Sequence, residues 1–197
     1  MSKLHPTKVQ LLETAVALID EFGPQGFTVD ALLEKSGISK GSLYHHFLDF
    51  SDVIEQAQVI RFSRYVDEDI RLLVTTLSVA NSPDDLRQRF ESIVLAASSP
   101  ERANARSDRA TIVGLARHSE KFAKSLSVEQ QRVTDALADI AREAQEKGFI
   151  RKDVDVRVLA TFLQAYTLGF VLNDVTVSPI SSQEWASFVG ATLSAAL

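Results

Sequence analysis

A cluster of hydrogen-bonding side chains lies within residues 37–47, GISKGSLYHHF. It holds two serine hydroxyls, a lysine ammonium, a tyrosine phenol and two adjacent imidazoles: Ser39, Ser42, Lys40, Tyr44, His45 and His46. Such groups donate to phosphate oxygens and to the edges of bases. Lysine favours guanine among the bases. The cluster indicates contact with nucleic acid, and we expect Lys40 and Ser42 to touch base edges.

The same residues also admit a catalytic interpretation. Gly37, Ser39 and Gly41 fit the pattern G-x-S-x-G, in which a nucleophilic serine sits on a sharp turn between a strand and a helix. The residues before Gly37 have helical spacing, no oxyanion-loop motif such as HGGG occurs, and His118 is the only histidine after residue 46. These features argue against a hydrolase, so we expect no enzyme and no catalytic residue.

Cofactor and metal sites are also not expected. The sequence has no phosphate loop, no dinucleotide fingerprint, no zinc-binding helix and no cysteine. His45 and His46 are poor candidates for a metal pair, because adjacent helical residues point about 100° apart.

Two short helices must hold the polar cluster. Thr28 can cap the first helix and Ser39 the second, since each hydroxyl can accept from a free backbone N–H. Gly37 supplies the positive φ of the turn between them. Their inner faces carry apolar residues at helical spacing, which are Val29, Leu32, Leu33, Leu43 and Phe47. This pattern predicts a helix-turn-helix, whose second helix enters the major groove of DNA.

At these residues the chain resembles the TetR family of transcriptional regulators. The match runs from Gly37 to Phe47, is preceded by Gly26-Phe27-Thr28 at the family's spacing, and covers roughly residues 8–55. It implies that Thr28 and Ser39 hold phosphate at helix N-termini and that Tyr44 and His45 clamp phosphate or read bases. Gly41 allows a close approach to the DNA surface.

Two positions leave alternatives open. His46 either touches DNA or packs inward, as the matching ring often does in the family. The family usually has a phosphate-contacting lysine three residues after Phe47, and here Phe50 holds that position. One cation is therefore lost, and the ring of Phe50 can pack between the two domains.

The charge distribution does not by itself indicate a protein that binds nucleic acid. The net charge is −5, and residues 1–50 hold four lysines and no arginine against six acids. Histidines beside DNA phosphates gain protons more readily. We therefore expect the affinity for DNA to rise as the pH falls from about 7.5 to about 6, across the normal range of histidine.

The pattern of apolar residues predicts an all-α protein of about nine helices. We expect an N-terminal three-helix helix-turn-helix DNA-binding domain in residues 1–50 and a C-terminal helical domain for ligand binding and dimerisation in residues 51–197. No signal peptide and no uninterrupted apolar run of bilayer length are evident, so we expect a cytoplasmic protein without membrane contact. An N-terminal arm with Lys3, His5 and Lys8 either reaches the DNA backbone or is a frayed end.

Helix boundaries in the second domain follow from caps and breakers. A long helix is expected from Ser51 or Asp52, and Ser82 and Pro83 start the next one. Residues 100–108 are polar and expected to be exposed. A capping box from Ser127 to Gln130 predicts the start of a further long helix.

Residues 156–175 and 183–196 are expected to form a homodimer interface. The first segment carries few charges and is apolar on more than one side, whereas a surface helix would have a polar face. In the family the final two helices form a four-helix dimer interface. A dimer also suits DNA, since two reading helices can address two half-sites.

The resemblance further implies a pocket in the helical body for a small-molecule effector. Its candidate residues are polar or aromatic side chains on otherwise apolar helices: Tyr65, Phe90, His118, Phe122, Tyr166 and Asn173. The favoured function is a dimeric, sequence-specific regulator that binds double-stranded operator DNA, a repressor released by the effector. The alternative is a helical ligand-binding or protein-interaction dimer with weak or lost DNA binding.

Overall fold

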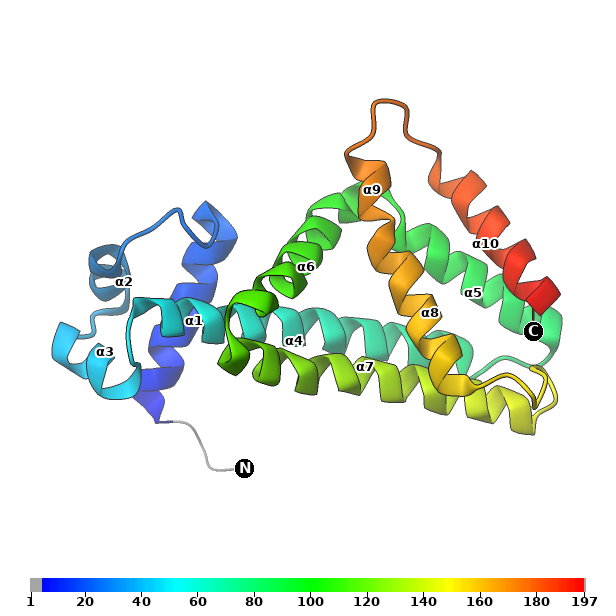
Figure 1. Cartoon of the computed structure of the whole chain (residues 1–197), viewed down its shortest axis with the longest axis horizontal. Helices are drawn as coiled ribbons and strands as arrows, with labels where there is room; N and C mark the ends of the chain where they lie inside the picture. The colour runs from blue at the N-terminus through cyan, green and yellow to red at the C-terminus, as the bar shows by residue number, and fades with distance from the viewer. Residues whose placement is uncertain (1–4, 197) are drawn as a thin grey trace.

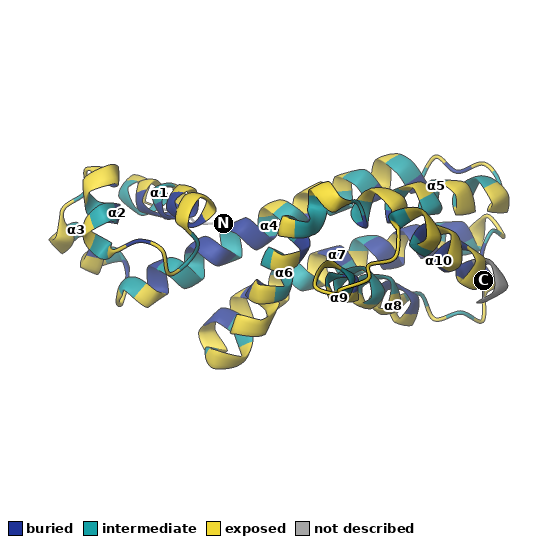
Figure 2. Cartoon of the chain, turned by 90° about the horizontal axis from the view of Figure 1, so that it is seen from above, coloured by how far each residue is buried: buried dark blue, intermediate teal, exposed yellow. Residues whose placement is uncertain are grey.

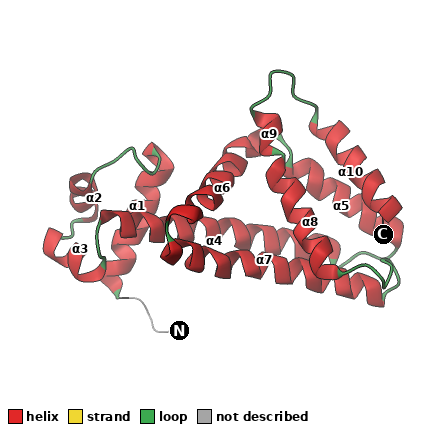
Figure 3. Cartoon of the chain, viewed as in Figure 1, coloured by secondary structure: helices red, strands yellow, loops and turns green. Residues whose placement is uncertain are grey.

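The computed structural model describes residues 5–196, in which helices are joined by loops and turns and there is no strand (Figures 1 and 3). The predicted all-α fold is therefore confirmed. The helices are α1 Pro6–Phe22, α2 Val29–Ser36, α3 Lys40–His46, α4 Phe50–Leu77, α5 Pro83–Ala97, α6 Ala103–Leu115, α7 Glu120–Glu146, α8 Val156–Gly169, the single turn α9 Val171–Asp174, and α10 Ser182–Ala196. Lys3 of the expected arm lies outside the described residues.

The three N-terminal helices pack around one small core. Leu11 and Leu12 of α1, Leu32 of α2 and Leu43 of α3 are buried there. The turn after α1 is tight, because a Cβ at Gly26 would lie 1.9 Å from the carbonyl oxygen of Phe22. Only glycine fits that position, which fixes the path from α1 into α2.

The long helix α4 joins the N-terminal helices to the body. It begins at Phe50, slightly earlier than expected, because the Asp49 carboxylate accepts from the Asp52 backbone N–H at 2.8 Å. Its 28 residues span about 42 Å. Its first turns bury Val53 and Ala57 in the N-terminal core, and Phe62 begins the core of the body. A domain division at residue 50 therefore stays a prediction, since α4 contributes to both cores.

Helices α6 and α7 differ from the expected boundaries. Residues 103–108, which were expected to be exposed, form the first part of α6, and Arg106 among them is buried. The helix α7 starts at Glu120, capped by Ser119, whose hydroxyl accepts from the Phe122 N–H at 3.2 Å. The capping box predicted at Ser127 is wrong, since that hydroxyl lies inside α7 and donates to the carbonyl of Lys124.

The last helices leave large apolar side chains in solvent (Figure 2). Val158 is 67% exposed on α8, Leu172 is 72% exposed on α9 and Phe188 is 66% exposed on α10. Within the described residues, one segment, Val156–Asp174, is long and apolar enough to cross a membrane, by its length and composition alone. This is the segment for which the sequence predicts a partner.

Candidate functional site

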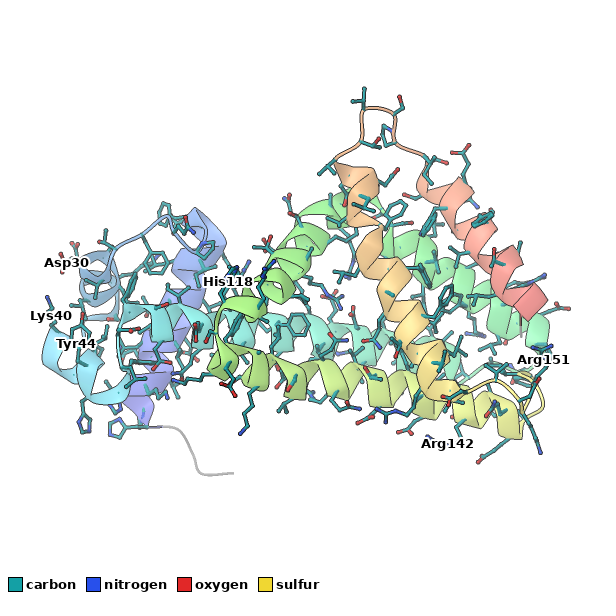
Figure 4. The ribbon with its side chains drawn as sticks, viewed as in Figure 1. Asp30, Lys40, Tyr44, His118, Arg142 and Arg151 are labelled. Carbon is teal, nitrogen blue, oxygen red and sulfur yellow. The ribbon has the colours of Figure 1, made fainter. Side chains whose placement is uncertain are left out.

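The helix α3 presents its polar side chains at the outer end of the N-terminal domain. Burial of Leu43 and Phe47 turns Lys40, Tyr44 and His45 to the outside. Tyr44 is 45% exposed, and Figure 4 shows it beside Lys40, with Asp30 of α2 at the same end. The predicted contact residues of α3 thus share one accessible surface.

The two predicted phosphate-holding hydroxyls both cap helices. Thr28 accepts from the Ala31 N–H at 3.3 Å, and Ser39 accepts from the Ser42 N–H at 3.3 Å. Gly37 between the two helices has a φ of 68°, as the turn requires. Both caps are exposed, and no neighbouring atom lies within 4 Å of a Cβ built on Gly41. A DNA backbone can therefore approach this surface closely.

Three histidines and a lysine gather at the other end of α3. The ring of His46 lies 4.9 Å from that of His5 and 5.0 Å from that of His45, and the ammonium of Lys8 lies 5.0 Å over the ring of Phe47. Partial desolvation and then the charges of His5, His45 and Lys8 lower the pKa of His46. His46 is half-buried, so it is neither a plain core residue nor a fully exposed one.

The helical body contains two neighbouring cavities. The first, which we call the arginine cavity, has a volume of about 110 Å³ and is lined by residues of α4 to α8, among them Asp69, Arg102, Arg106, Arg109 and Tyr166. The second, which we call the apolar cavity, has a volume of about 340 Å³ and lies between α5, α7, α8 and α10. Phe90, Leu137 and Leu163 line both cavities and therefore separate them.

The predicted effector residues divide into two groups. Phe90 and Tyr166 line the arginine cavity, where burial raises the pKa of Tyr166 and keeps its phenol neutral. The other four lie outside both cavities. Tyr65 donates to Asp108, Phe122 belongs to the core, and Asn173 bonds the backbone of Ile180. His118 is exposed at the corner between α6 and α7 (Figure 4).

The sequence interpretation missed the arginines of this cavity, although a signal was present. Arg102, Arg106 and Arg109 recur at spacings of four and three, which places them on one face of a helix. Residues 100–108 were expected to be exposed because they are polar, and arginine is seldom buried unless it has a partner. The partner of Arg106 is Asp174, which is 68 positions further along the chain.

Two family descriptions together match most of the chain. "Bacterial regulatory proteins, tetR family" matches residues 11–49, and "BetI-type transcriptional repressor, C-terminal" matches residues 82–197, more than half of the chain. The chain belongs to the TetR family of transcriptional regulators. It is therefore a DNA-binding transcriptional regulator and not an enzyme.

Similar proteins and solved structures match most of the chain. The transcriptional repressor AcnR of Corynebacterium glutamicum is 28% identical over 166 residues, which are 84% of this chain and 80% of AcnR. The regulator UidR of Escherichia coli is 25% identical over 95% of this chain and 89% of its own. The structure of FadR from Bacillus subtilis in complex with stearoyl-CoA shares the fold, with a TM-score of 0.61, 17% identity and coverage of 94% and 96% of the two chains.

The surroundings of Ser39 and Phe50 in this TetR protein exclude two of the alternatives that the sequence leaves open. Ser39 caps a helix and follows another helix, so the strand that a nucleophile elbow requires is absent from this part of the described chain. Phe50 meets Phe27 edge to face, with ring centroids 5.6 Å apart. Phe50 therefore closes the N-terminal core and does not pack between the two domains.

A buried guanidinium connects the DNA-binding helices to the body of this TetR protein. Arg61 of α4 donates to Asp20 of α1 at 2.7 Å, to Asp108 of α6 at 2.5 Å and to Gln58 at 2.9 Å. Burial opposes its charge, but the two carboxylates outweigh that effect and raise the pKa of Arg61. The helix that carries the cavity arginines, α6, is thus tied to α1 through one side chain of α4.

Proposed function

We propose that this protein is a homodimeric repressor whose binding to operator DNA is weakened when a small molecule occupies the helical body. The observation that carries the proposal is the arginine cavity, because α6 lines it and is also bound to the DNA-binding helices through Arg61. A ligand that shifts α6 would shift that junction. A repressor that binds operator DNA must have access to the chromosome. We therefore propose that the protein is cytoplasmic.

The exposed faces of α8 and α10 support the homodimer. Large apolar side chains in water are unfavourable, and a second copy would remove them from solvent. The predicted interface residues, 156–175 and 183–196, include Phe162 and Phe188, which are 49% and 66% exposed in the single chain. A two-fold interface of these helices would hold two copies of α3 in fixed register for two half-sites.

The DNA contacts proposed for α2 and α3 have two roles. Thr28, Ser39 and His45 are placed to hold phosphates, and Lys40 and Ser42 are placed to reach base edges. Tyr44 can serve either purpose, since its phenol is exposed on the same surface. His46 and Gly41 set how closely the DNA backbone approaches.

The test is a titration of fluorescent DNA from the region upstream of the protein's own gene, with a random duplex beside it. We expect steeply salt-dependent binding that prefers the upstream DNA and falls at least about tenfold in Tyr44→Ala. Equal and weak binding to both duplexes would contradict the proposal. It would favour the alternative of a ligand-binding or protein-interaction dimer, to which the acidic N-terminal domain and Phe50 point.

A further inference from the structure

Three guanidinium groups that differ in how firmly they are held line the arginine cavity: Arg102 at the N-cap of α6, and Arg106 and Arg109 within α6. Arg106 is held most firmly. It donates two hydrogen bonds to Asp174, at 2.8 and 2.5 Å, and two to the backbone carbonyls of Ala97 and Ser99. Arg102 pairs with Glu68, whose side chain is 51% exposed. Arg109 pairs with Asp69 at 2.6 Å. Arg102 and Arg109 are therefore the two that can change partner.

The carboxylate of Asp69 occupies the position of an anion inside this cavity. Asp69 and Arg109 both line it, and their side chains are 23% and 22% exposed. Burial raises the pKa of Asp69 although Arg109 and Arg102 favour its charge. Burial therefore makes Asp69 easier to protonate than an exposed carboxyl, and a ligand carboxylate can take its place beside Arg109 once Asp69 is neutral.

Most of the remaining cavity wall is apolar, with Gln164, Tyr166 and Thr167 as polar members, and the apolar cavity adjoins it. Phe90, Leu137 and Leu163 separate the two spaces, and beyond them the lining includes Leu86, Ile140 and Leu159. Both cavities follow α5, from Ala97 at the arginine end to Pro83 at the other. This is about 21 Å of helix, so the two cavities lie end to end, with the three arginines and Asp69 at one end and the opposite charges of Asp84 and Arg87 at the other.

We propose that the ligand is an amphipathic anion, a carboxylate on a long unbranched hydrocarbon chain. Its head is held by Arg109 and Arg102 in place of Asp69, and its tail passes Phe90 into the apolar cavity. Guanidinium groups recognise a carboxylate through paired hydrogen bonds, and the apolar cavity is within the size range of ligand sites. The inference rests on the proposed function of the body and adds the chemical class of its ligand.

The test compares hexadecanoate with hexadecan-1-ol, which differ in the charge of the head group. The full-length protein contains a single tryptophan, Trp185, whose ring lies 6.1 Å from that of Tyr166 in the cavity wall, so its fluorescence reports binding. We expect hexadecanoate to bind at least about tenfold more tightly than the alcohol. Octanoate should bind more weakly by a factor of about three to four per missing methylene. Equal affinity for acid and alcohol would overturn the assignment of the head group.

Variants separate recognition of the head from stability of the fold. Asp69→Asn frees Arg109 and should tighten hexadecanoate binding by about tenfold. Because Arg109→Gln alone leaves Asp69 buried without its partner, the double variant D69N/R109Q removes both charges together. It should bind acid and alcohol alike. Arg142→Gln is the control, since this arginine lies on α7 with a side chain 54% exposed and pairs with Asp139 of the same helix. A double variant that still prefers the acid would overturn the inference.

Release of DNA distinguishes this inference from the proposed function. Hexadecanoate should weaken binding to the upstream DNA in the natural protein and not in the double variant. If the natural protein binds that DNA but neither acid nor alcohol binds the body, the inference fails and the repressor remains. If the protein without ligand does not prefer the upstream DNA, the proposed function fails, whatever the tryptophan titration shows.

Discussion

At the scale of single residues, alanine substitutions at two glycines test the stability of the fold and the affinity for DNA separately. Gly41→Ala should leave the protein folded and can raise its stability by up to about 1 kcal/mol, since alanine favours helix and no atom lies near the added methyl group. In the proposed complex the methyl group faces the DNA, so affinity should fall by about tenfold, the equivalent of one base contact. Thermal unfolding and DNA titration check the two effects.

Gly26→Ala is the matched contrast to Gly41→Ala. A Cβ there meets the backbone of Phe22, which cannot move aside as a side chain would. We expect a loss of stability of about 2 kcal/mol or more, measured by denaturant unfolding. If Gly26→Ala were as stable as the natural protein, the tight turn after α1 would be wrong.

The histidine cluster predicts opposite pH effects on folding and on DNA binding. Because the pKa of His46 is lower in the folded chain than in the unfolded one, the unfolded chain takes up protons first as the pH falls. Stability should therefore decrease as the pH falls from about 7.5 to about 6. Phosphates favour the protonated ring, so DNA affinity should increase over the same interval, at most about tenfold per pH unit for each proton taken up.

His46→Gln provides the check on this pH dependence. Glutamine keeps a polar side chain but does not titrate, so both slopes should decrease. Affinity is measured at constant salt, because salt alone changes phosphate contacts. A DNA affinity that does not vary with pH in the natural protein would rule out the role of the cluster.

At this scale much of the site could be predicted, because its rules are local. Thr28, Ser39 and Gly37 act within three residues of themselves, as caps and as a left-handed turn. The contacts of Phe50 and His46 could not be predicted, since Phe27 and His5 approach them from other elements. The pattern of residues along the chain does not show which ring from a distant element will pack against a given side chain.

At the scale of elements, Arg61 should matter more than an exposed arginine with a similar pattern of bonds. Arg61→Met removes a side chain that is 8% exposed and bridges α1, α4 and α6. We expect a loss of about 2 kcal/mol in the free energy of unfolding, because Gln58, which is 2% exposed, loses its partner. A weaker release of DNA by ligand should accompany it, since α6 is no longer tied to α1.

Arg132→Gln is the control for Arg61→Met. Arg132 also bridges two helices, with Glu129 on α7 and Asp67 on α4, but its side chain is 43% exposed. Its removal should cost less than about 1 kcal/mol. Denaturant unfolding of both variants checks the difference, and equal losses would show that burial does not decide the strength of these pairs.

The errors in helix boundaries belong to this scale as well. Ser127 fits a local capping box, yet the apolar stripe of α7 continues backwards through Leu126 and Phe122, and Ser119 caps the longer helix. Packing of that stripe on α4 overrides the local motif. The polar residues of α6 looked exposed because the acids that pair with Arg106 and Arg109 lie on other helices.

At the scale of the whole molecule, the proposed dimer is tested by charging its apolar face. Phe188→Glu and Phe162→Glu alter exposed side chains, so each monomer should stay folded to within about 0.5 kcal/mol apart from the lost association. Sedimentation should show monomers, and DNA affinity should fall strongly. Val128→Glu is the control, since this valine is 59% exposed but lies on α7. Dimers that persist in both phenylalanine variants would place the interface elsewhere.

The exposed apolar surface of α8 to α10 also has a consequence for how such a regulator responds to its own abundance. When two copies must meet before either can occupy an operator, the active form grows with the square of the monomer concentration as long as most chains are single. A halving of the protein in the cell then removes three quarters of the active form. Growth and division alone would release the regulated genes in cells that make little of it, even without any ligand.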